Sequence, residues 1–299
     1  MNLNQIELLR ILQETQFNLT KAAEKMHIVQ SAVSRQLQLF EEELGSPLFH
    51  RQGKKLISLT PLGERIMEEV DKINQAKNNI KAIAADFLDS DYGTLHIATT
   101  HTQAKYFLPM AIQRFRKKYP NVSIYMVQAS PDQLVQQLHT RQADIAICTE
   151  RVDLDHNLVL QKCYDWHHAI VVPQGHPLAE DELSLQRLAT FPILTYNFGY
   201  TGRSNIDKAF NALGLELDII LAAADTDVIK TYVRLGIGVG LIADMAYDSI
   251  SDSDLVIRKL NEFIPSSSTK VAYLKHNYLP IYSQHFIDEL LIAAKEFVN

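Results

Sequence analysis

The spacing of apolar residues changes near Gly93 of this 299-residue chain. Before that glycine, apolar side chains such as Leu3, Ile6 and Leu9 recur at intervals typical of amphipathic helices. After it, short apolar runs alternate with segments of helical spacing, which predicts strands and helices in turn. The chain is therefore expected to fold as an all-α N-terminal region followed by a larger α/β region.

Composition narrows the classes of protein to which the chain can belong. Hydrophobic residues make up 46% and charged residues 21%, which is ordinary for a globular protein. Two cysteines, Cys148 and Cys163, are too few for a disulfide framework. No apolar run reaches the roughly 18 residues of a membrane span, and the N-terminal segment lacks the features of a signal peptide. We therefore expect a cytoplasmic protein with no membrane partner.

The net charge of −6 is unevenly distributed along the chain. Residues 1–60 hold 7 basic and 6 acidic side chains, whereas the remaining residues hold 22 basic and 29 acidic ones. Three cations, Arg51, Lys54 and Lys55, surround Gly53 in a short polar turn. Cations at the tip of a hairpin are typical of contacts to DNA phosphates, so an acidic chain of this kind can still carry a DNA-binding module.

Three short helices and a two-stranded wing are expected in residues 1–60. Helical spacing predicts helices over about residues 4–15 and 21–26, and a third that opens near Ser31 and ends at Gly45. The buried stripe of the third helix would be Val33, Leu37, Phe40 and Leu44. Its outward face would carry polar groups suited to base edges and phosphates, namely Gln30, Ser31, Ser34, Arg35 and Gln38. This layout indicates a winged helix-turn-helix, with a plain three-helix bundle as the alternative.

A long linker helix is expected over residues 61–90. Thr60 and Pro61 are typical of a helix start, and an interrupted heptad of apolar residues follows them. The members of this heptad are Leu62, Ile66, Val70, Ile73, Ile80, Ile83 and Phe87. So narrow an apolar stripe predicts pairing with a second copy of the helix, hence a homodimer. A homotetramer of two such dimers is also expected, although the stripe leaves dimer and tetramer open. Docking of the stripe onto its own domain is the alternative.

The remaining residues, 91–299, predict an α/β domain of two lobes, similar in architecture to periplasmic binding proteins. One set of strands and helices runs to about residue 163, a second spans about 164–265, and residues 266–299 return to the first set. Strands are expected over residues 94–100, 122–127, 144–149, 169–172, 193–195, 217–222, 239–243 and 270–274, in parallel-rich sheets. Such an arrangement predicts a ligand cleft between the lobes at the carboxyl ends of strands.

Neutral hydrogen-bonding side chains gather at the expected strand ends. Thr100, Thr102 and Gln103 lie where the first strand gives way to a helix, and Thr149 ends the third strand. Thr201 opens a helix in the second lobe. Hydroxyl and amide groups beside a helix N-terminus predict an anion site that needs no cation, although helix capping alone is the alternative.

Four N-terminal motifs, in this order, resemble those of the LysR-type transcriptional regulators. They are LTKAA at 19–23, QSAVSRQL at 30–37, LGSPLFHR at 44–51 and LTPLG at 59–63. Three later motifs resemble the CysB/Cbl branch of that family, namely IATTHTQA at 97–104, FGYTGRS at 198–204 and DTDVIKTYVRLG at 225–236. Together these motifs make the resemblance extend over nearly the whole chain.

The resemblance implies a regulator of sulfur assimilation and cysteine biosynthesis that binds double-stranded promoter DNA. Its effector would be sulfate, acetylserine or a related small anionic or zwitterionic metabolite, bound between the lobes. The implied ligand contacts are Thr100, Thr102, Gln103, Thr149 and Thr201, with Trp166 nearby, and Ser34 and Arg35 would lie on the recognition helix. Two features depart from the branch: His167-His168 stands where Asn-Arg is expected, and His27 stands where a tyrosine is familiar.

Other chemistries find little support in the sequence. The glycines of Gly236–Gly240 follow an expected helix and open an expected strand, the reverse of a dinucleotide-binding turn. The histidines and cysteines show no metal-ligand spacing, and no nucleophile is paired with a base. We therefore expect neither an enzyme nor a cofactor or metal site. A LysR-type regulator that responds to another small anion and a solute-binding protein remain as alternatives.

Overall fold

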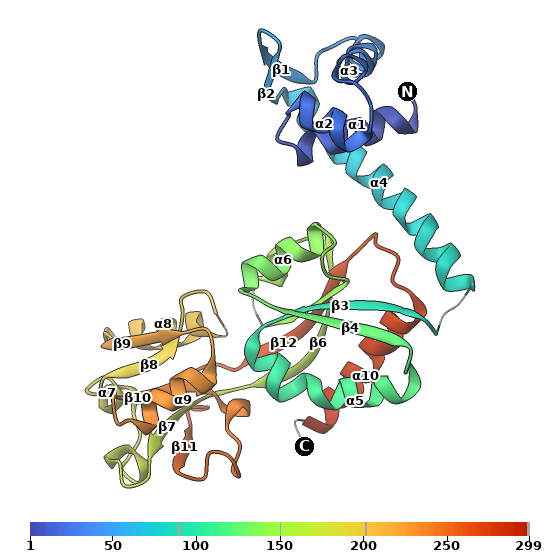
Figure 1. The fold of residues 1–299 in the computed structure, drawn as a ribbon. Helices are drawn as coiled ribbons and strands as arrows, with labels where there is room; N and C mark the ends of the chain where they lie inside the picture. Colours follow the sequence, from blue (N-terminus) through green and yellow to red (C-terminus); the bar gives the residue numbers. More distant parts are fainter. Residues whose placement is uncertain (89–90, 150, 201, 298–299) are drawn as a thin grey trace. The chain divides into compact units, whose positions relative to one another are not determined.

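The computed structural model describes residues 1–88, 91–149, 151–200 and 202–297 (Figure 1). Its contacts divide the chain into two compact units, Met1–Ala85 and Asp86–Asn299. The first unit is helical with one hairpin, and the second is an α/β structure of two sheets. The expected fold class is confirmed. Among the described residues, no helix combines the length and the apolar character needed to cross a membrane.

The first unit is a winged helix-turn-helix. Its elements are α1 (Leu3–Glu14), α2 (Leu19–Met26), α3 (Gln30–Leu44), β1 (Phe49–Gln52), β2 (Lys55–Leu59) and the beginning of α4 (Pro61–Leu88). Asn18 is the N-cap residue of α2, and its side chain accepts hydrogen bonds from the backbone N–H groups of Thr20 and Lys21. The antiparallel β1–β2 pair forms the wing around Gly53.

The core of the first unit lies between the three helices, with one departure from expectation. Val33, Leu37 and Phe40 of α3 are buried as predicted. The prediction for Leu44 is wrong, because this side chain is 37% exposed. Leu44 lies in the last turn of α3, which ends at Gly45 in the left-handed conformation, beyond the stretch that packs against α1 and α2.

The apolar stripe of α4 divides into two halves with different surroundings. Met67 and Val70 are buried in the core of the first unit, and Ile66 and Ile73 pack against that core. The second half is open to solvent, with Ile80 69% and Phe87 91% exposed. Docking onto its own domain therefore accounts for the first half of the stripe only. The linker was expected to reach residue 90, but residues 89 and 90 lie outside the described part of the chain.

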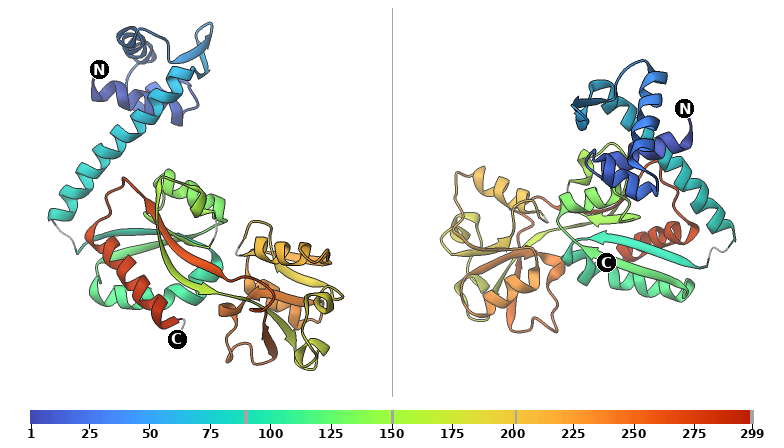
Figure 2. Two further views of the ribbon diagram at one scale, coloured as in Figure 1. Left: turned by 180° about the vertical axis from the view of Figure 1, so that it is seen from behind. Right: turned by 45° about the horizontal axis from the view of Figure 1, so that its top comes forward.

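Lobe I of the second unit is built on a five-stranded sheet. Its strands are β3 (Gly93–Thr99), β4 (Val122–Gln128), β5 (Ile145–Cys148), β6 (Leu158–Trp166) and β12 (Ser267–Leu274), in the order β4-β3-β5-β12-β6. Its helical segments are η1 (Gln103–Phe107), α5 (Leu108–Lys118), α6 (Pro131–His139), η2 (Val152–Leu154) and α10 (Ile281–Phe297). Helices α5 and α10 lie side by side (Figures 1 and 2), and the rings of Phe115 and Phe286 meet edge-to-face at 5.3 Å.

Lobe II is built on the second five-stranded sheet. Its strands are β7 (His168–Pro173), β8 (Ile193–Tyr196), β9 (Ile219–Ala223), β10 (Val239–Ala243) and β11 (Leu255–Lys259), in the order β11-β7-β10-β8-β9. Its helical segments are η3 (Pro177–Ala179), α7 (Leu185–Leu188), α8 (Arg203–Asn211), α9 (Thr226–Arg234) and η4 (Asp244–Ala246). The chain crosses from lobe I to lobe II after β6 and returns before β12.

The sheets differ from the expected parallel-rich arrangement. In lobe I, β3 pairs in parallel with β4 and β5, but β12 runs antiparallel to β5 and β6. In lobe II, β8 pairs in parallel with β9 and β10, but β7 runs antiparallel to β10 and β11. Each sheet is therefore mixed. Strands β7 and β12 each enter their sheet directly after the chain passes from one lobe to the other, without the intervening helix that a parallel connection needs.

Candidate functional site

The outward face of α3 carries the residues predicted to contact DNA. Gln30, Ser31, Arg35 and Gln38 are exposed and Ser34 is half-buried. The amide of Gln30 donates to Ser34 Oγ over 3.1 Å, which orders two side chains near the start of the helix. The N-cap Val29 has no side chain able to cap α3, so the first-turn N–H groups lack a side-chain partner there. This end of the helix suits contacts to a phosphate oxygen.

The three cations of the wing have different surroundings. Arg51 pairs with Glu41 at 2.5 Å, and the same carboxylate accepts the backbone N–H of Leu48 over 2.8 Å. Arg51 therefore joins the wing to α3 and is partly committed to that contact. Lys54, in the turn of the hairpin, and Lys55, the first residue of β2, are exposed and make no ion pair within the described part of the chain. These two lysines are the wing cations most available to a phosphate.

In lobe I, three strand ends bring predicted ligand residues to one edge of the sheet. β3 and β5 are parallel neighbours, so Thr100 and Thr149, which follow them, lie at the same edge. β6 runs in the same direction across β12, which places its last residue, Trp166, there as well. Thr100, Thr102, Gln103, Thr149 and Trp166 are all buried. Thr201, the remaining predicted ligand contact, lies outside the described residues.

The side chain of Gln103 is held by two residues that the sequence did not suggest. Its Nε2 donates to Thr269 Oγ1 over 3.0 Å, and its Oε1 accepts the hydroxyl of Tyr164 over 2.7 Å. Thr269 and Tyr164 face each other across β12 and β6. Burial raises the pKa of Tyr164, so this hydroxyl stays protonated and able to donate. One N–H of the Gln103 amide remains available to a ligand.

Thr102 connects lobe I with lobe II. Its hydroxyl lies 3.4 Å from that of Thr226, the first residue of α9, and Thr226 lies 2.7 Å from the hydroxyl of Tyr196. The backbone N–H of Ala243 donates to the same tyrosine oxygen over 3.0 Å. Thr226 falls within the motif at 225–236, whereas no local pattern points to Tyr196, whose partners are far away in the chain.

Trp166 and His168 present polar atoms that the fold does not satisfy. Their rings lie 5.0 Å apart, and both side chains are almost fully buried. Trp166 Nε1 and His168 Nδ1 have no hydrogen-bonding partner within the described part of the chain. Burial, together with the neighbouring His167, lowers the pKa of His168 to about 4, so its imidazole is neutral at physiological pH. This neutral ring stands at the position where the resemblance to the CysB/Cbl branch implies an arginine.

One group of His, Asp and Glu side chains has ligand atoms close enough to hold a metal ion. His101, Asp225 and Asp227 bring such atoms within 4.8 Å of one another, a proximity that sequence spacing did not predict. Lys105 forms an ion pair with Asp227, and the hydroxyl of Tyr106 donates to the same carboxylate over 2.7 Å. Because the Asp227 carboxylate is already paired with Lys105, the three residues form part of an ion-pair network between the lobes.

Comparison with known proteins agrees with this architecture. Residues 3–64 match the family described as "Bacterial regulatory helix-turn-helix protein, lysR family", and residues 89–295 match the "LysR substrate binding domain". The chain is 40% identical over 289 residues to the transcriptional regulator SsuR of Burkholderia cenocepacia, covering 96% of this chain and 94% of that protein. It is 39% identical over 289 residues to CysB of Haemophilus influenzae, covering 96% and 89%.

Among solved structures, the cofactor-binding domain of the Cbl transcriptional regulator is similar to the second unit. The TM-score is 0.65 at 36% identity, and the alignment covers 69% of this chain and 92% of that domain. The proteins named in these comparisons are regulators and not enzymes. With both its helix-turn-helix and its substrate-binding domain matched, the chain belongs to the LysR family of bacterial transcriptional regulators and is related to the sulfur regulators SsuR, CysB and Cbl.

Proposed function

We propose that this regulator controls genes of sulfur assimilation and cysteine biosynthesis in response to a small anion bound between its lobes. The observation that carries the proposal is the gathering of buried Thr100, Thr102 and Thr149 at one sheet edge, beside the amide of Gln103. Sulfate is fully ionised at physiological pH and accepts hydrogen bonds at every oxygen. A set of neutral donors therefore suits it, as it suits the carboxylate of acetylserine.

The orphaned polar atoms of Trp166 and His168 support a ligand at the same edge. A buried donor without a partner costs about 1–3 kcal/mol, and a ligand oxygen at Trp166 Nε1 would recover part of that cost. Thr201 belongs to this proposed ligand set through its place in the motif at 198–204. In this proposal the effector alone supplies the hydrogen-bonding partners that the site lacks, and no metal or other cofactor is needed.

The DNA-bound form is proposed to be a homodimer that pairs into a tetramer. Ile80, Ile83 and Phe87 are exposed along the second half of α4, and a second copy of the helix would cover them. Two-fold symmetry would place two α3 helices on half-sites about one helical turn, or a multiple of it, apart. In this proposal Gln30, Ser31, Ser34, Arg35 and Gln38 contact promoter DNA in the cytoplasm, with Arg51, Lys54 and Lys55 at the phosphates.

A binding experiment at one fixed salt concentration tests the proposal. The affinity of the full chain for the promoter of a cysteine-biosynthesis gene is compared with that for a scrambled duplex, with and without sulfate and acetylserine. We expect preference for the promoter and a change in affinity or footprint when a ligand is added. Promoter preference that neither ligand alters would overturn the sulfur assignment and favour a regulator that responds to another small anion.

A further inference from the structure

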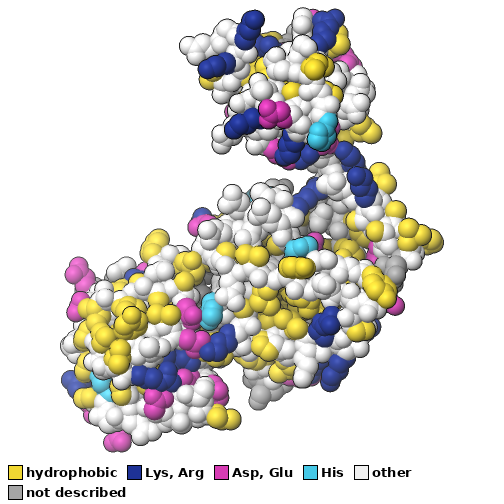
Figure 3. All heavy atoms as spheres, in the orientation of Figure 1, with side chains coloured by type: hydrophobic (Ala, Val, Ile, Leu, Met, Phe, Trp, Pro, Cys, Tyr) yellow, Lys and Arg dark blue, Asp and Glu magenta, His cyan; other side chains and the backbone are white. Residues whose placement is uncertain are grey.

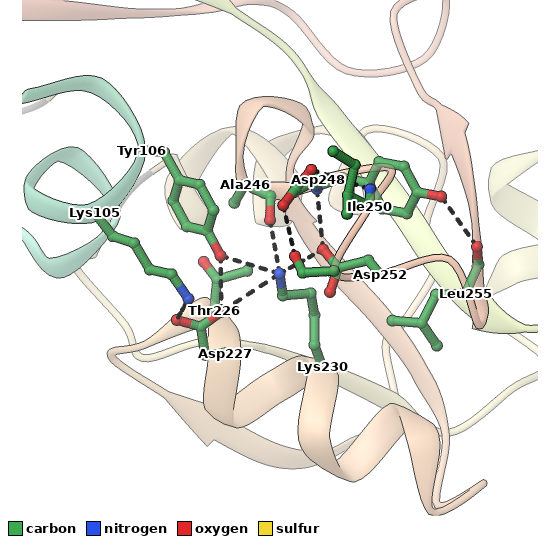
Figure 4. Close-up of polar contacts among 12 residues, drawn as sticks. Lys105, Tyr106, Thr226, Asp227, Lys230, Ala246, Asp248, Ile250, Asp252 and Leu255 are labelled. Atoms are coloured by element: carbon green, nitrogen blue, oxygen red, sulfur yellow. Dashed lines mark hydrogen bonds and ion pairs between the residues drawn. The ribbon is translucent and has the colours of Figure 1, made fainter. Parts of the chain in front are cut away.

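Charged side chains and a histidine gather where lobe I meets lobe II (Figure 3). At this place η1 of lobe I lies against α9 of lobe II, and the side chains between them form one connected network (Figure 4). His101 Nε2 lies 3.1 Å from Asp225 and 3.5 Å from Asp227, which adds a third contact from lobe I. The network is therefore a link between lobes and not a feature of either lobe alone.

Tyr106 is the central member of this network. Its hydroxyl donates to Asp227 Oδ1 over 2.7 Å and accepts a hydrogen bond from Lys230 Nζ over 3.0 Å. One hydroxyl from lobe I thus satisfies a carboxylate and an ammonium group of lobe II at the same time. Burial and the hydrogen bond to Asp227 raise the pKa of Tyr106, so the proton needed for this donation stays on the oxygen.

The partners of Tyr106 are held firmly within lobe II. Lys230 is 2% exposed, and its Nζ also donates to the carbonyl of Ala246 over 2.9 Å and to Asp252 over 2.6 Å. Asp252 in turn accepts from Arg234 over 2.7 Å. Burial alone would raise the pKa of Asp227, but hydrogen bonds from Lys105 and Tyr106 and the charge of Lys230 lower it to about 2. The carboxylate is therefore ionised at any physiological pH.

The same two segments carry the network and the proposed ligand contacts. Gln103, Lys105 and Tyr106 all belong to η1, a single π-helical turn of five residues. On the other side, Thr226 and Asp227 are consecutive residues of α9, and Thr226 is the residue that meets Thr102. A shift of η1 relative to α9 would therefore move the ligand contacts and break the network together. Such π-helical turns occur frequently at functional sites.

From this geometry we infer that Tyr106, with Lys105 and Asp227, is an interlobe positioning group that holds η1 against α9 in the arrangement that binds the effector. The inference rests on the proposed function for the identity of the ligand, but the link between lobes exists without it. Tyr106 contributes most, because its partner Lys230 is only 2% exposed and the hydrogen bond between them is partly buried. The Lys105–Asp227 pair is 50% and 32% exposed and is screened by solvent and salt. A protein that already favours the effector-binding arrangement of η1 and α9 binds its ligand more tightly, because a smaller fraction of the molecules must change conformation on binding.

The test compares two tyrosine variants that each lose one hydroxyl. Y106F removes the two interlobe hydrogen bonds of the Tyr106 hydroxyl and keeps the ring, whereas Y247F removes a hydroxyl that donates to Leu255 within lobe II over 3.1 Å. Sulfate affinity of the full-length protein is measured by calorimetry. We expect Y106F to weaken sulfate binding about tenfold, as for a lost hydrogen bond to charged partners, and Y247F to change it less than about twofold. A Y106F variant that binds sulfate as tightly as Y247F would overturn the inference.

A second measurement reports on the lobes directly and needs no ligand. Spin labels are attached at two exposed positions, Lys117 of α5 and Lys208 of α8, after each is changed to cysteine. The C163A background removes the partly exposed native cysteine. Dilution of labelled into unlabelled protein limits the measured distances to pairs within one chain. We expect a broader distance distribution between these two positions in Y106F and in K105Q than in Y247F. Distributions of equal width in all variants contradict the interlobe role. If wild-type protein does not bind sulfate, the proposed function fails, while these distances still decide the inference.

Discussion

Lys230 and Asp252 form an ion pair of 2.6 Å in which both side chains are almost entirely buried, at 2% and 3% exposure. The backbone carbonyl of Ala246 accepts a further hydrogen bond from the same ammonium group. Removing one member of a buried pair leaves the other charge unpaired in a medium of low dielectric constant, which costs more than the pair itself contributes. The pair thus makes the stability of lobe II depend on α9.

The Lys230–Asp252 pair predicts a large loss of stability in K230M. We expect the free energy of unfolding of the second unit to fall by about 3 kcal/mol, because the buried Asp252 loses its buried cation and keeps the ion pair with the partly exposed Arg234. Trp166, the one tryptophan of the chain, lies in that unit, so its fluorescence during urea unfolding reports the change. K208M on the exposed face of α8 is the matched control and should cost less than about 0.5 kcal/mol. A double variant K230M/D252N that is as unstable as K230M would argue against the charge explanation.

Gly63 packs so closely against the wing that a side chain cannot fit. A Cβ at this position would lie 2.1 Å from the carbonyl oxygen of Leu48. We expect G63A to destabilise the first unit by at least about 1–3 kcal/mol through overpacking and to abolish specific DNA binding. Circular dichroism melting of the helices checks this, while the fluorescence of Trp166 in the other unit should keep its midpoint. G45N is the control, since Gly45 is open to solvent and asparagine tolerates its left-handed conformation.

The buried, neutral His168 predicts a dependence of stability on pH. The imidazole takes up a proton near pH 6.5 in the unfolded chain but only near pH 4 in the fold, where burial lowers its pKa. The unfolded state therefore binds more protons between these values, so the contribution of His168 is fully present above pH 6.5 and is lost as the pH falls to 4. The loss is on the order of 3 kcal/mol by linkage.

Urea unfolding of the second unit at several pH values measures this contribution. H168N should show a shallower decline than wild type between pH 6.5 and 4, because asparagine does not titrate. H156N, which replaces an exposed histidine of lobe I, should follow the wild-type curve. Parallel curves for wild type and H168N would mean that the pKa of His168 does not differ between the folded and the unfolded protein, which contradicts the prediction.

The hydroxyl of Thr102 is predicted to contact the effector. T102A should weaken sulfate binding by about 1–2 kcal/mol, the value of a hydrogen bond to a charged group. Isothermal titration calorimetry measures the change, with T231A as the control because the Thr231 hydroxyl is exposed and donates to the carbonyl of Asp227 within its own helix. Unchanged sulfate affinity in T102A would show that this threonine serves the contact with Thr226 alone.

Two cations of the wing are predicted to differ in their effect on DNA binding. Lys54 is exposed, so K54A should lower the slope of log affinity against log salt by about one unit, as for one lost phosphate contact. Arg51 is paired with Glu41, so R51A should in addition lower the melting temperature of the first unit. Fluorescence anisotropy at four salt concentrations gives both slopes. A K54A slope equal to that of wild type would place Lys54 away from the DNA backbone.

Elements whose formation depends on neighbouring residues are predictable from the sequence. Helices α2 and α3, the wing around Gly53 and the strands with continuous apolar runs all follow from local spacing and turn residues. Strands β6 and β11 were not predicted, because polar side chains such as Gln161, Lys162 and Asp165 interrupt the apolar run of β6. Four of the nine residues of β6 are partly buried and two are exposed, without a regular alternation, so the strand lacks the pattern that hydrophobic periodicity detects.

Three features follow from the amino-acid sequence alone: the order of the domains, the polar face of α3 and the presence of Thr100, Thr102 and Gln103 at a strand end. The sequence could not determine which distant groups meet. Tyr106 and Asp227 are 121 positions apart, and Tyr106 and Lys230 are 124 apart, with nothing in either segment to indicate the pairing. These pairings arise in the fold, because two folded lobes bring η1 and α9 together, and burial then makes each polar group require a partner.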